Sequence, residues 1–241
     1  MDGTLLKMTH KRLFQRPILD LDCKMILHIF GDSWGTPWKI QEKQHFLHRD
    51  KDYINHSAGG ISISNIRNIF FTVKNQIKPT DSIFFVIPPD IRFFAPDMRT
   101  YSVIQKEWQR TFKYYDTTQL DDYFSSVIFC EIILLQTIAK RVVGDNYWMW
   151  HNYGSLDFQH PLYGSEIDHD RFVSYTSMMD HLLGYSTKLE PRQDGPDVQL
   201  TNTSRYFLKD DQHPSVKGHN KLHKIYSEFC KDKFFATVLT K

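Results

Sequence analysis

Short apolar runs alternate along the chain with stretches of helical periodicity. The runs of strand length occupy residues 24–30, 53–56, 82–87 and 146–150. Apolar residues recur at helical spacing in four segments, 61–77, 120–143, 171–183 and 216–235. The run 82–87 is apolar almost throughout, as expected of a strand buried on both faces. Strands that alternate with helices predict an α/β protein with a mostly parallel sheet covered on both sides.

The segments between these elements lack such periodicity. Residues 1–23 are predicted to be an N-terminal lead-in, and residues 186–204 a polar loop. Residues 91–118 are aromatic and irregular, which predicts an insertion over the active edge of the sheet with a helix near 103–113. No repeat and no change in composition divides the 241 residues, so a single domain spanning 1–241 is predicted.

The first predicted strand ends at Gly31, and Ser33 follows two residues later. A glycine tolerates backbone angles that a Cβ disfavours, so the sequence predicts a sharp turn there. The turn places Ser33 at the carboxyl end of a buried strand, the edge of an open α/β sheet where ligands bind. A serine in this place also caps helices, so its chemistry depends on a base within reach.

A candidate base lies near the other end of the chain, in Asp210-Asp211-Gln212-His213-Pro214-Ser215. A carboxylate three residues before a histidine can accept a hydrogen bond from one imidazole nitrogen, which leaves the other nitrogen to take a proton from a serine hydroxyl. Asp210 is the predicted carboxylate and Asp211 the alternative. Ser215 is predicted to cap the helix that follows. The competing interpretation is an ordinary histidine in a helix-entry loop beside a solvated acid.

Together, Gly31-Asp32-Ser33 and Asp210-x-x-His213-Pro214 resemble the first and last sequence blocks of the SGNH/GDSL hydrolase family. The resemblance implies a three-layer α/β/α sandwich with a flavodoxin-like central sheet, in agreement with the pattern of elements. It implies Ser33 as nucleophile, His213 as general base and Asp210 as the carboxylate that orients the base. The family's second block supplies a glycine N–H after the second strand, and Gly60 is the better match here. The Ser33 and Gly60 N–H groups are therefore the predicted oxyanion donors.

The third block departs from the family pattern. The family usually places Gly-x-Asn-Asp after the third strand, with the asparagine side chain as a third oxyanion donor. This chain has Ile87-Pro88-Pro89-Asp90-Ile91-Arg92 there, without an asparagine. An ionised Asp90 repels an oxyanion, Arg92 is a candidate cationic donor, and one lost donor typically costs about 2.7–4 kcal/mol of transition-state stabilisation. The alternatives are a family variant with another third donor and an enzyme that works with two.

Aromatic residues are frequent in the segments predicted to border the active edge. They are Trp34, Trp38, Phe93, Phe94, Tyr101 and Trp108. Their faces can stack on sugar rings or acyl chains, or they can pack in the core and the loops. Trp34, Asp90 and Arg92 are the predicted substrate contacts.

The formal net charge is only +2, so no strong field favours nucleic acid or a membrane surface as a partner. Residues 1–16 lack the apolar core of a signal peptide, and no run reaches the length of a membrane span. A cytoplasmic protein is therefore expected; a virion-associated protein would also lack such signals. The three cysteines, Cys23, Cys130 and Cys230, are far apart and odd in number, so reduced, buried thiols are expected rather than a disulfide framework.

Twelve histidines raise the question of a metal site. The pairs His45/His48 and His219/His223 have spacings that can share a helical face. Neither pair has an evident third ligand. Surface or packing roles are therefore expected for these side chains, with no metal and no organic cofactor.

Gly31-Asp-Ser-Trp-Gly35 also satisfies the nucleophile-elbow pattern of α/β-hydrolases, but that elbow follows several strands and only 32 residues precede Ser33. The sequence predicts instead a serine hydrolase of SGNH type that cleaves an ester through an acyl-enzyme. The expected substrate is an O-acetyl or other short acyl ester on a carbohydrate or lipid. Two alternatives stay open: a glycan-binding or structural module with weakened catalysis, and an acyltransferase that uses the same triad.

Overall fold

The computed structural model describes residues 25–49, 52–88, 117–152, 156, 158–184, 205–208 and 213–239. Within them, four strands form one parallel sheet in the order β2-β1-β3-β4. The strands are β1 (Ile26–Phe30), β2 (Asp52–Asn55), β3 (Ser82–Ile87) and β4 (Tyr147–His151). The helices are α1 (Ile63–Val73), α3 (Thr117–Val143), α4 (Met178–Leu183) and α5 (Val216–Leu239).

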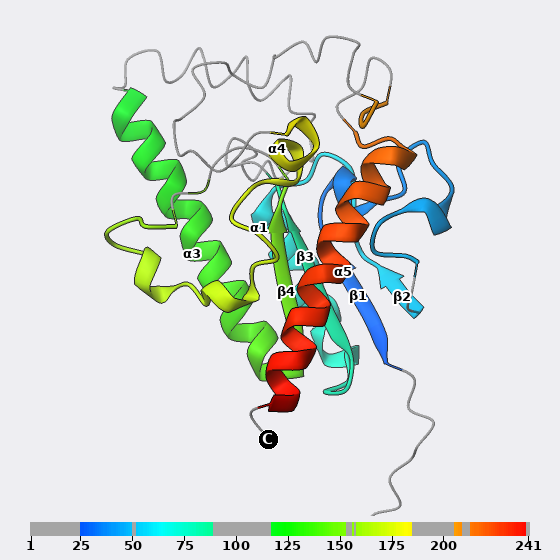
Figure 1. Ribbon diagram of the computed structural model, residues 1–241. Coiled ribbons are helices and arrows are strands. Elements are labelled where there is room, and N and C mark those ends of the chain that lie inside the picture. Colours follow the sequence, from blue (N-terminus) through cyan, green and yellow to red (C-terminus); the bar gives the residue numbers. More distant parts are fainter. Residues whose placement is uncertain are drawn as a thin grey trace, which may run out of the picture.

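The helices cover both faces of the sheet (Figure 1). α1 and α3 pack on one face, over a core that includes Phe85 and Ile87, and α4 and α5 pack on the other, over Phe84 and Val86. Successive side chains of a strand point to opposite faces, so β3 contributes to both cores and is buried along its whole length. The predicted three-layer α/β/α class with a parallel sheet is confirmed.

One predicted helix is wrong over its first half. The periodicity predicts a helix over 171–183, whereas α4 begins only at Met178, capped by the Ser177 side chain. Phe172 forms a parallel bridge with Met149, and the Val173 N–H donates to Met149 O at 3.0 Å. This stretch therefore runs along β4, because its backbone groups find partners on the strand before a helix begins.

Other predictions fall on residues that the structure does not describe. The lead-in 1–23, the helix expected near 103–113 and the loop 186–204 lie outside the described residues, as does nearly all of the insertion 91–118.

The expectation of buried thiols is wrong for Cys130. Cys130 is exposed on α3 and Cys230 is half-buried, while Cys23 lies outside the described residues. The neighbouring Phe129 and Ile132 face the core, and helical geometry turns Cys130 away from it.

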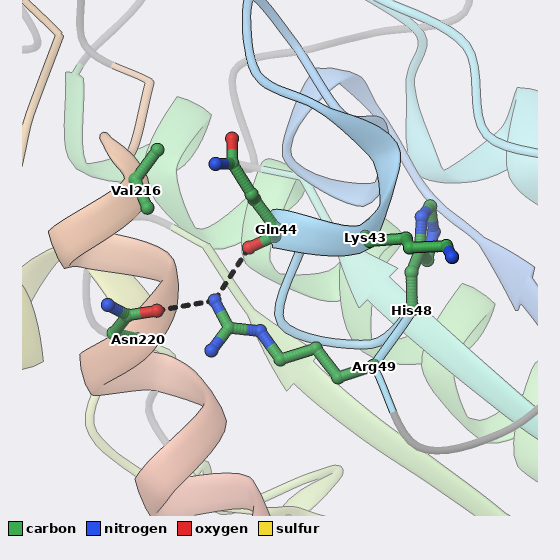
Figure 2. Close-up of a pocket in the computed structure, with 6 residues that line it drawn as sticks. All are labelled: Lys43, Gln44, His48, Arg49, Val216 and Asn220. Carbon is green, nitrogen blue, oxygen red and sulfur yellow. Dashed lines mark hydrogen bonds between the residues drawn. The ribbon is translucent and has the colours of Figure 1, made fainter.

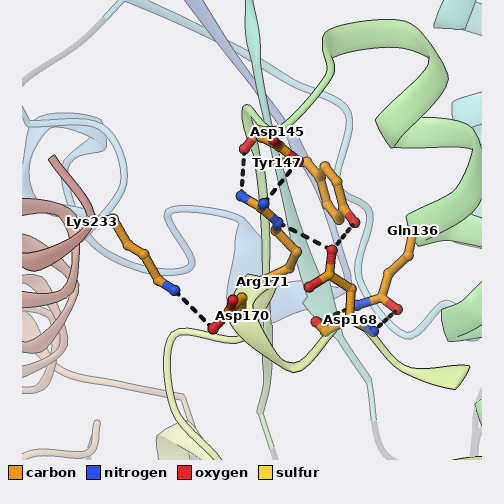
Figure 3. Close-up of polar contacts among 7 residues, drawn as sticks. All are labelled: Gln136, Asp145, Tyr147, Asp168, Asp170, Arg171 and Lys233. Carbon is orange, nitrogen blue, oxygen red and sulfur yellow. Dashed lines mark hydrogen bonds and ion pairs between the residues drawn. The ribbon is translucent and has the colours of Figure 1, made fainter. Parts of the chain in front are cut away.

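A polar network fixes the amino end of β4 (Figure 3). The Asp168 backbone N–H and O pair with the Gln136 side chain, each at 3.0 Å. The Asp168 carboxylate accepts hydrogen bonds from Tyr147 Oη and Arg171 Nε, both at 3.3 Å, and Arg171 also donates to Asp145 Oδ1 at 2.8 Å. Burial, and then the Asp168 charge, raises the pKa of Tyr147, which keeps the phenol protonated as a donor. The network therefore holds the amino end of β4 in place.

Gly31 is required for a close approach of two strands rather than for an unusual backbone angle. Its φ is not among the positive values, which for glycine occur at Gly60, Gly144 and Gly184 within the described residues. A Cβ built on Gly31 would stand 2.6 Å from Val86 Cβ and 3.2 Å from Val86 O. The predicted need for an unusual backbone angle at Gly31 is thus wrong, and its close contact with β3 explains the glycine.

The Gly31→Ala variant should be less stable by about 1–3 kcal/mol, because the added methyl group overpacks the junction of β1 and β3. Urea unfolding monitored by circular dichroism measures the change. Gly59→Ala is the matched control, since the nearest atom to its built Cβ is 3.9 Å away. Equal stability losses in the two variants would contradict the packing explanation.

Candidate active site

Ser33 lies in a turn at the carboxyl edge of the sheet, called the serine turn below (residues 31–36). A short 3-10 helix spans Ser33–Gly35. Asp32 caps it, since its Oδ1 accepts a hydrogen bond from the Trp34 backbone N–H at 3.0 Å. The Thr36 hydroxyl donates to Ser33 O at 2.8 Å. These bonds hold the serine in a defined place, and only 6% of Ser33 is exposed.

The loop after β2 packs against the serine turn. The Ala58 N–H donates to Gly31 O at 3.0 Å, and Asn55 Nδ2 donates to Gly35 O at 2.8 Å. Gly59 stands beside the serine, because a Cβ built on it would lie 3.9 Å from Ser33 Cβ. Gly60 follows with a φ of 74°, which favours glycine. Its role as oxyanion donor stays a prediction, and Gly59 is the adjacent candidate.

His213 lies in a short paired segment that precedes α5. Phe207 and Pro214 form an antiparallel bridge, and the Leu208 N–H donates to His213 O at 2.9 Å. The predicted cap at Ser215 is confirmed, since its Oγ accepts a hydrogen bond from the Gly218 N–H at 3.3 Å. The paired segment and the beginning of α5 therefore hold the backbone of His213 in place.

Aromatic contacts bring the two motifs together. The rings of Trp38 and His213 stack with centroids 5.1 Å apart and planes 25° apart. Trp34 packs edge-on against Phe207, with centroids 6.5 Å apart. Residues that follow Ser33 by one and five positions thus contact the segment of His213, although the two lie nearly two hundred positions apart in sequence.

Trp34 and Trp38 have opposite environments. Trp34 is 1% exposed and belongs to the core beneath α4 and α5, whereas Trp38 is 43% exposed. The substrate contact predicted for Trp34 stays a prediction. Trp38 is partly exposed beside His213, and Lys39 Nζ lies 5.9 Å from its ring centroid.

The remaining predicted site residues lie outside the described residues. They are Asp210, the alternative Asp211, Asp90, Arg92, Phe93, Phe94, Tyr101 and Trp108. Their roles as orienting carboxylate, oxyanion neighbour or substrate contacts stay predictions.

Asn152, which the sequence reasoning did not select, lies directly after β4 at the same edge. Its Nδ2 donates to Asp32 Oδ2 at 2.8 Å, and both side chains are fully buried. A polar residue two positions after the predicted strand 146–150 was the available signal. The motif resemblance drew attention to the end of the third strand instead.

Three histidines form a buried cluster beneath the serine turn. The His45 ring lies 4.4 Å from that of His48 and 4.7 Å from that of His219, between centroids. His45 Nε2 lies 3.0 Å from Trp34 O, and the Leu47 N–H donates to its Nδ1 at 3.3 Å. The neutral tautomer with a proton on Nε2 satisfies both contacts. The sequence pairs His45 with His48 and His219 with His223, whereas the fold packs His219 with the first pair.

Burial is the main cause that lowers the pKa of each histidine in this cluster. The pKa of His48 falls to about 4 and that of His219 to about 3. The pKa of His45 lies well below its usual value, through burial and then the charges of His219 and His48. The three imidazoles are therefore neutral at pH 7.

A recess of about 450 Å³ lies between the residues that follow the serine turn and the first turns of α5 (Figure 2). Its lining residues are Lys43, Gln44, His48, Arg49, Val216 and Asn220. Arg49 Nη2 donates to Gln44 O at 2.7 Å and to Asn220 Oδ1 at 2.6 Å. The guanidinium thus joins α5, and with it the segment of His213, to the chain that follows Ser33.

In the part of the chain that the structure describes, no three His, Cys, Asp or Glu side chains are grouped so as to hold a metal ion. Among the described helices, none combines the length and the hydrophobicity needed to cross a membrane.

No protein-family model matches the chain, and no curated protein matches it significantly. Among solved structures it is similar to TesA, with 10% sequence identity over 86% of this chain and 99% of TesA and a TM-score of 0.47. It is also similar to a member of the lipolytic protein G-D-S-L family from Veillonella parvula DSM 2008, with 12% identity over 85% of this chain and 97% of that one and a TM-score of 0.43. At these values the chemistry has to be inferred from the residues of the chain itself.

Proposed function

We propose that this chain is a serine hydrolase that cleaves an ester. The observation that carries the proposal is the meeting of the serine turn with the segment of His213 at one sheet edge, through the Trp38–His213 and Trp34–Phe207 contacts. A serine becomes a nucleophile when an imidazole can take its proton. The two contacts support the proposal, because they join the segments that carry the serine and the imidazole near the edge where open α/β sheets bind ligands.

In the proposed reaction, Ser33 Oγ attacks the ester carbonyl while His213 takes the hydroxyl proton. Asp210 orients the imidazole and stabilises its charged form. The Ser33 and Gly60 N–H groups stabilise the tetrahedral oxyanion. Collapse of the intermediate expels the alcohol, which takes the proton from His213, and leaves an acyl-enzyme. Water, activated by the same imidazole, then releases the acid.

The proposed substrate is a short acyl ester, such as an O-acetyl group, on a carbohydrate or lipid. Trp38 supports this class, because a partly exposed indole beside the proposed general base offers apolar surface to a sugar ring or an acyl chain. We expect a small acyl group, because only 6% of Ser33 is exposed.

A fluorophosphonate probe tests the proposal, because it phosphonylates serines that a base has activated. We expect one adduct per chain, located by mass spectrometry on the peptide that contains Ser33. His213→Gln should slow the labelling by about 10²–10⁴-fold, the usual contribution of a general base. His160→Gln is the matched control, since His160 contacts Phe129 and Tyr163 on the other face of the sheet.

An adduct on a different serine would contradict the proposal. No adduct in a folded protein that binds glycans would favour the binding-module alternative. Hydrolysis of p-nitrophenyl acetate, with and without an added alcohol as acyl acceptor, separates a hydrolase from an acyltransferase that uses the same residues.

A further inference from the structure

Asn152 is held rigidly at the end of β4. Its backbone N–H donates to Ile87 O at 3.0 Å, which continues the ladder between β3 and β4. Its carbonyl accepts the Met179 N–H at 3.0 Å from the first turn of α4. With both backbone groups fixed, the side chain reaches past the end of β3 to Asp32, two residues after β1.

The Asp32 carboxylate is oriented through both of its oxygens. Oδ1 accepts the Trp34 N–H at 3.0 Å, and Oδ2 accepts Asn152 Nδ2 at 2.8 Å. Asp32 and Asn152 are 0% exposed, so water does not compete for these bonds. A buried carboxylate is costly unless hydrogen-bond donors satisfy it, and Asn152 supplies one of the two donors described here.

We propose that Asn152 is a positioning residue for Ser33: it orients the Asp32 carboxylate, which in turn caps the short helix that begins at Ser33. The inference rests on the proposed function, in which Ser33 reacts. Asn152 does not touch the substrate in this scheme. It acts through Asp32, across 120 residues of sequence.

The expected size of the effect follows from geometry. A displacement of a reacting group by about 1 Å can cost on the order of 100-fold in rate. In the Asn152→Asp variant, assayed at about pH 8 so that the two carboxyl groups do not share a proton, the amide donor to Oδ2 of Asp32 is replaced by a second carboxylate. The repulsion between the two charges pushes the serine turn away from β4. We expect kcat to fall about 100-fold with little change in KM, because the loss concerns the reacting geometry rather than binding.

An exchange of the Asp32 and Asn152 side chains tests whether Asn152 positions Ser33 or only contributes to the stability of the fold. The double variant Asp32→Asn/Asn152→Asp places an amide at position 32 and a carboxylate at position 152. The amide oxygen at 32 can still accept the Trp34 N–H, and its N–H₂ can donate to the carboxylate. We expect the double variant to recover most of the lost kcat. Asn146→Asp, which adds the same charge at the amino end of β4, is the matched control.

Hydrogen exchange of the Trp34 backbone amide gives a readout independent of catalysis. We expect exchange about tenfold faster in Asn152→Asp and near the wild-type rate in the double variant, since that amide reports on the Asp32 cap. Melting curves of all variants verify that they are folded.

Two results would overturn the inference. One is a folded Asn152→Asp variant with unchanged kcat and unchanged Trp34 exchange. The other is a folded double variant in which exchange stays as fast as in the single variant. If the wild type neither hydrolyses esters nor reacts with the probe, the proposed function fails, while the exchange data still decide whether Asn152 holds the serine turn.

Discussion

Replacing Ser33 by alanine should reduce ester hydrolysis by about 10⁴–10⁶-fold in kcat, the loss typical for removal of a serine nucleophile. In the proposed mechanism no acyl-enzyme can form without this hydroxyl. The variant can then only stabilise the transition state of a direct attack by water on the ester. The burst of p-nitrophenol in rapid kinetics should vanish with the steady-state rate. The fold should persist, because the bonds that shape the serine turn use the Ser33 backbone and the Asp32 side chain.

Ser57→Ala is the matched control for this experiment. Ser57 lies in the loop that packs on the serine turn, and its Oγ is buried without a hydrogen-bond partner among the described residues. Its removal leaves the proposed triad and oxyanion donors in place, so hydrolysis should stay near the wild-type rate. Equal rates of hydrolysis by the wild type and Ser33→Ala would show that Ser33 is not the nucleophile.

Acidification from pH 7 to pH 4 should destabilise the protein by several kcal/mol, because His45, His48 and His219 are buried as neutral groups. Their pKa values are lowered, to about 4 for His48 and about 3 for His219. An unfolded histidine binds its proton near pH 6.5. Between about pH 6.5 and the folded pKa values, the unfolded state therefore holds more protons, and the free energy of unfolding falls as pH falls. The contribution of these three histidines to the free energy of unfolding is complete above about pH 6.5 and is lost progressively toward about pH 3.

Urea unfolding at a series of pH values measures this slope. His48→Gln should flatten it, since an amide at that position keeps a polar group near Asn55 but binds no proton in this range. His160→Gln should leave the slope unchanged, as His160 lies outside the cluster. A free energy of unfolding that is the same at pH 7 and pH 5 would contradict the expected role of the buried histidines.

Much of the architecture could be predicted from the local pattern of apolar and polar residues. The run 82–87 coincides with β3, and the helical periodicity of 61–77 predicts α1. Such elements follow from the repeat of apolar side chains, which is a property of neighbouring residues. The prediction of a helix over 171–183 is wrong in its first half. Pairing with Met149, which is distant in sequence, decides the conformation there.

The candidate site was only partly predictable for the same reason. The motifs select Ser33 and His213, but they say nothing about which side chains hold them. Trp38 beside His213, Asn152 beneath Asp32 and His219 among the other histidines are contacts between distant segments. The close approach at Gly31 likewise depends on Val86 of a neighbouring strand.

The amino-acid sequence by itself determined the order and type of most elements, the α/β/α class and the two polar motifs, because each depends on residues close together in the chain. The tertiary structure alone decided that Asn152 reaches Asp32 past the end of β3, and that His219 packs with His45. The reason is physical: strand order and helix packing set which distant side chains meet, and periodicity along the chain contains no information about those distances.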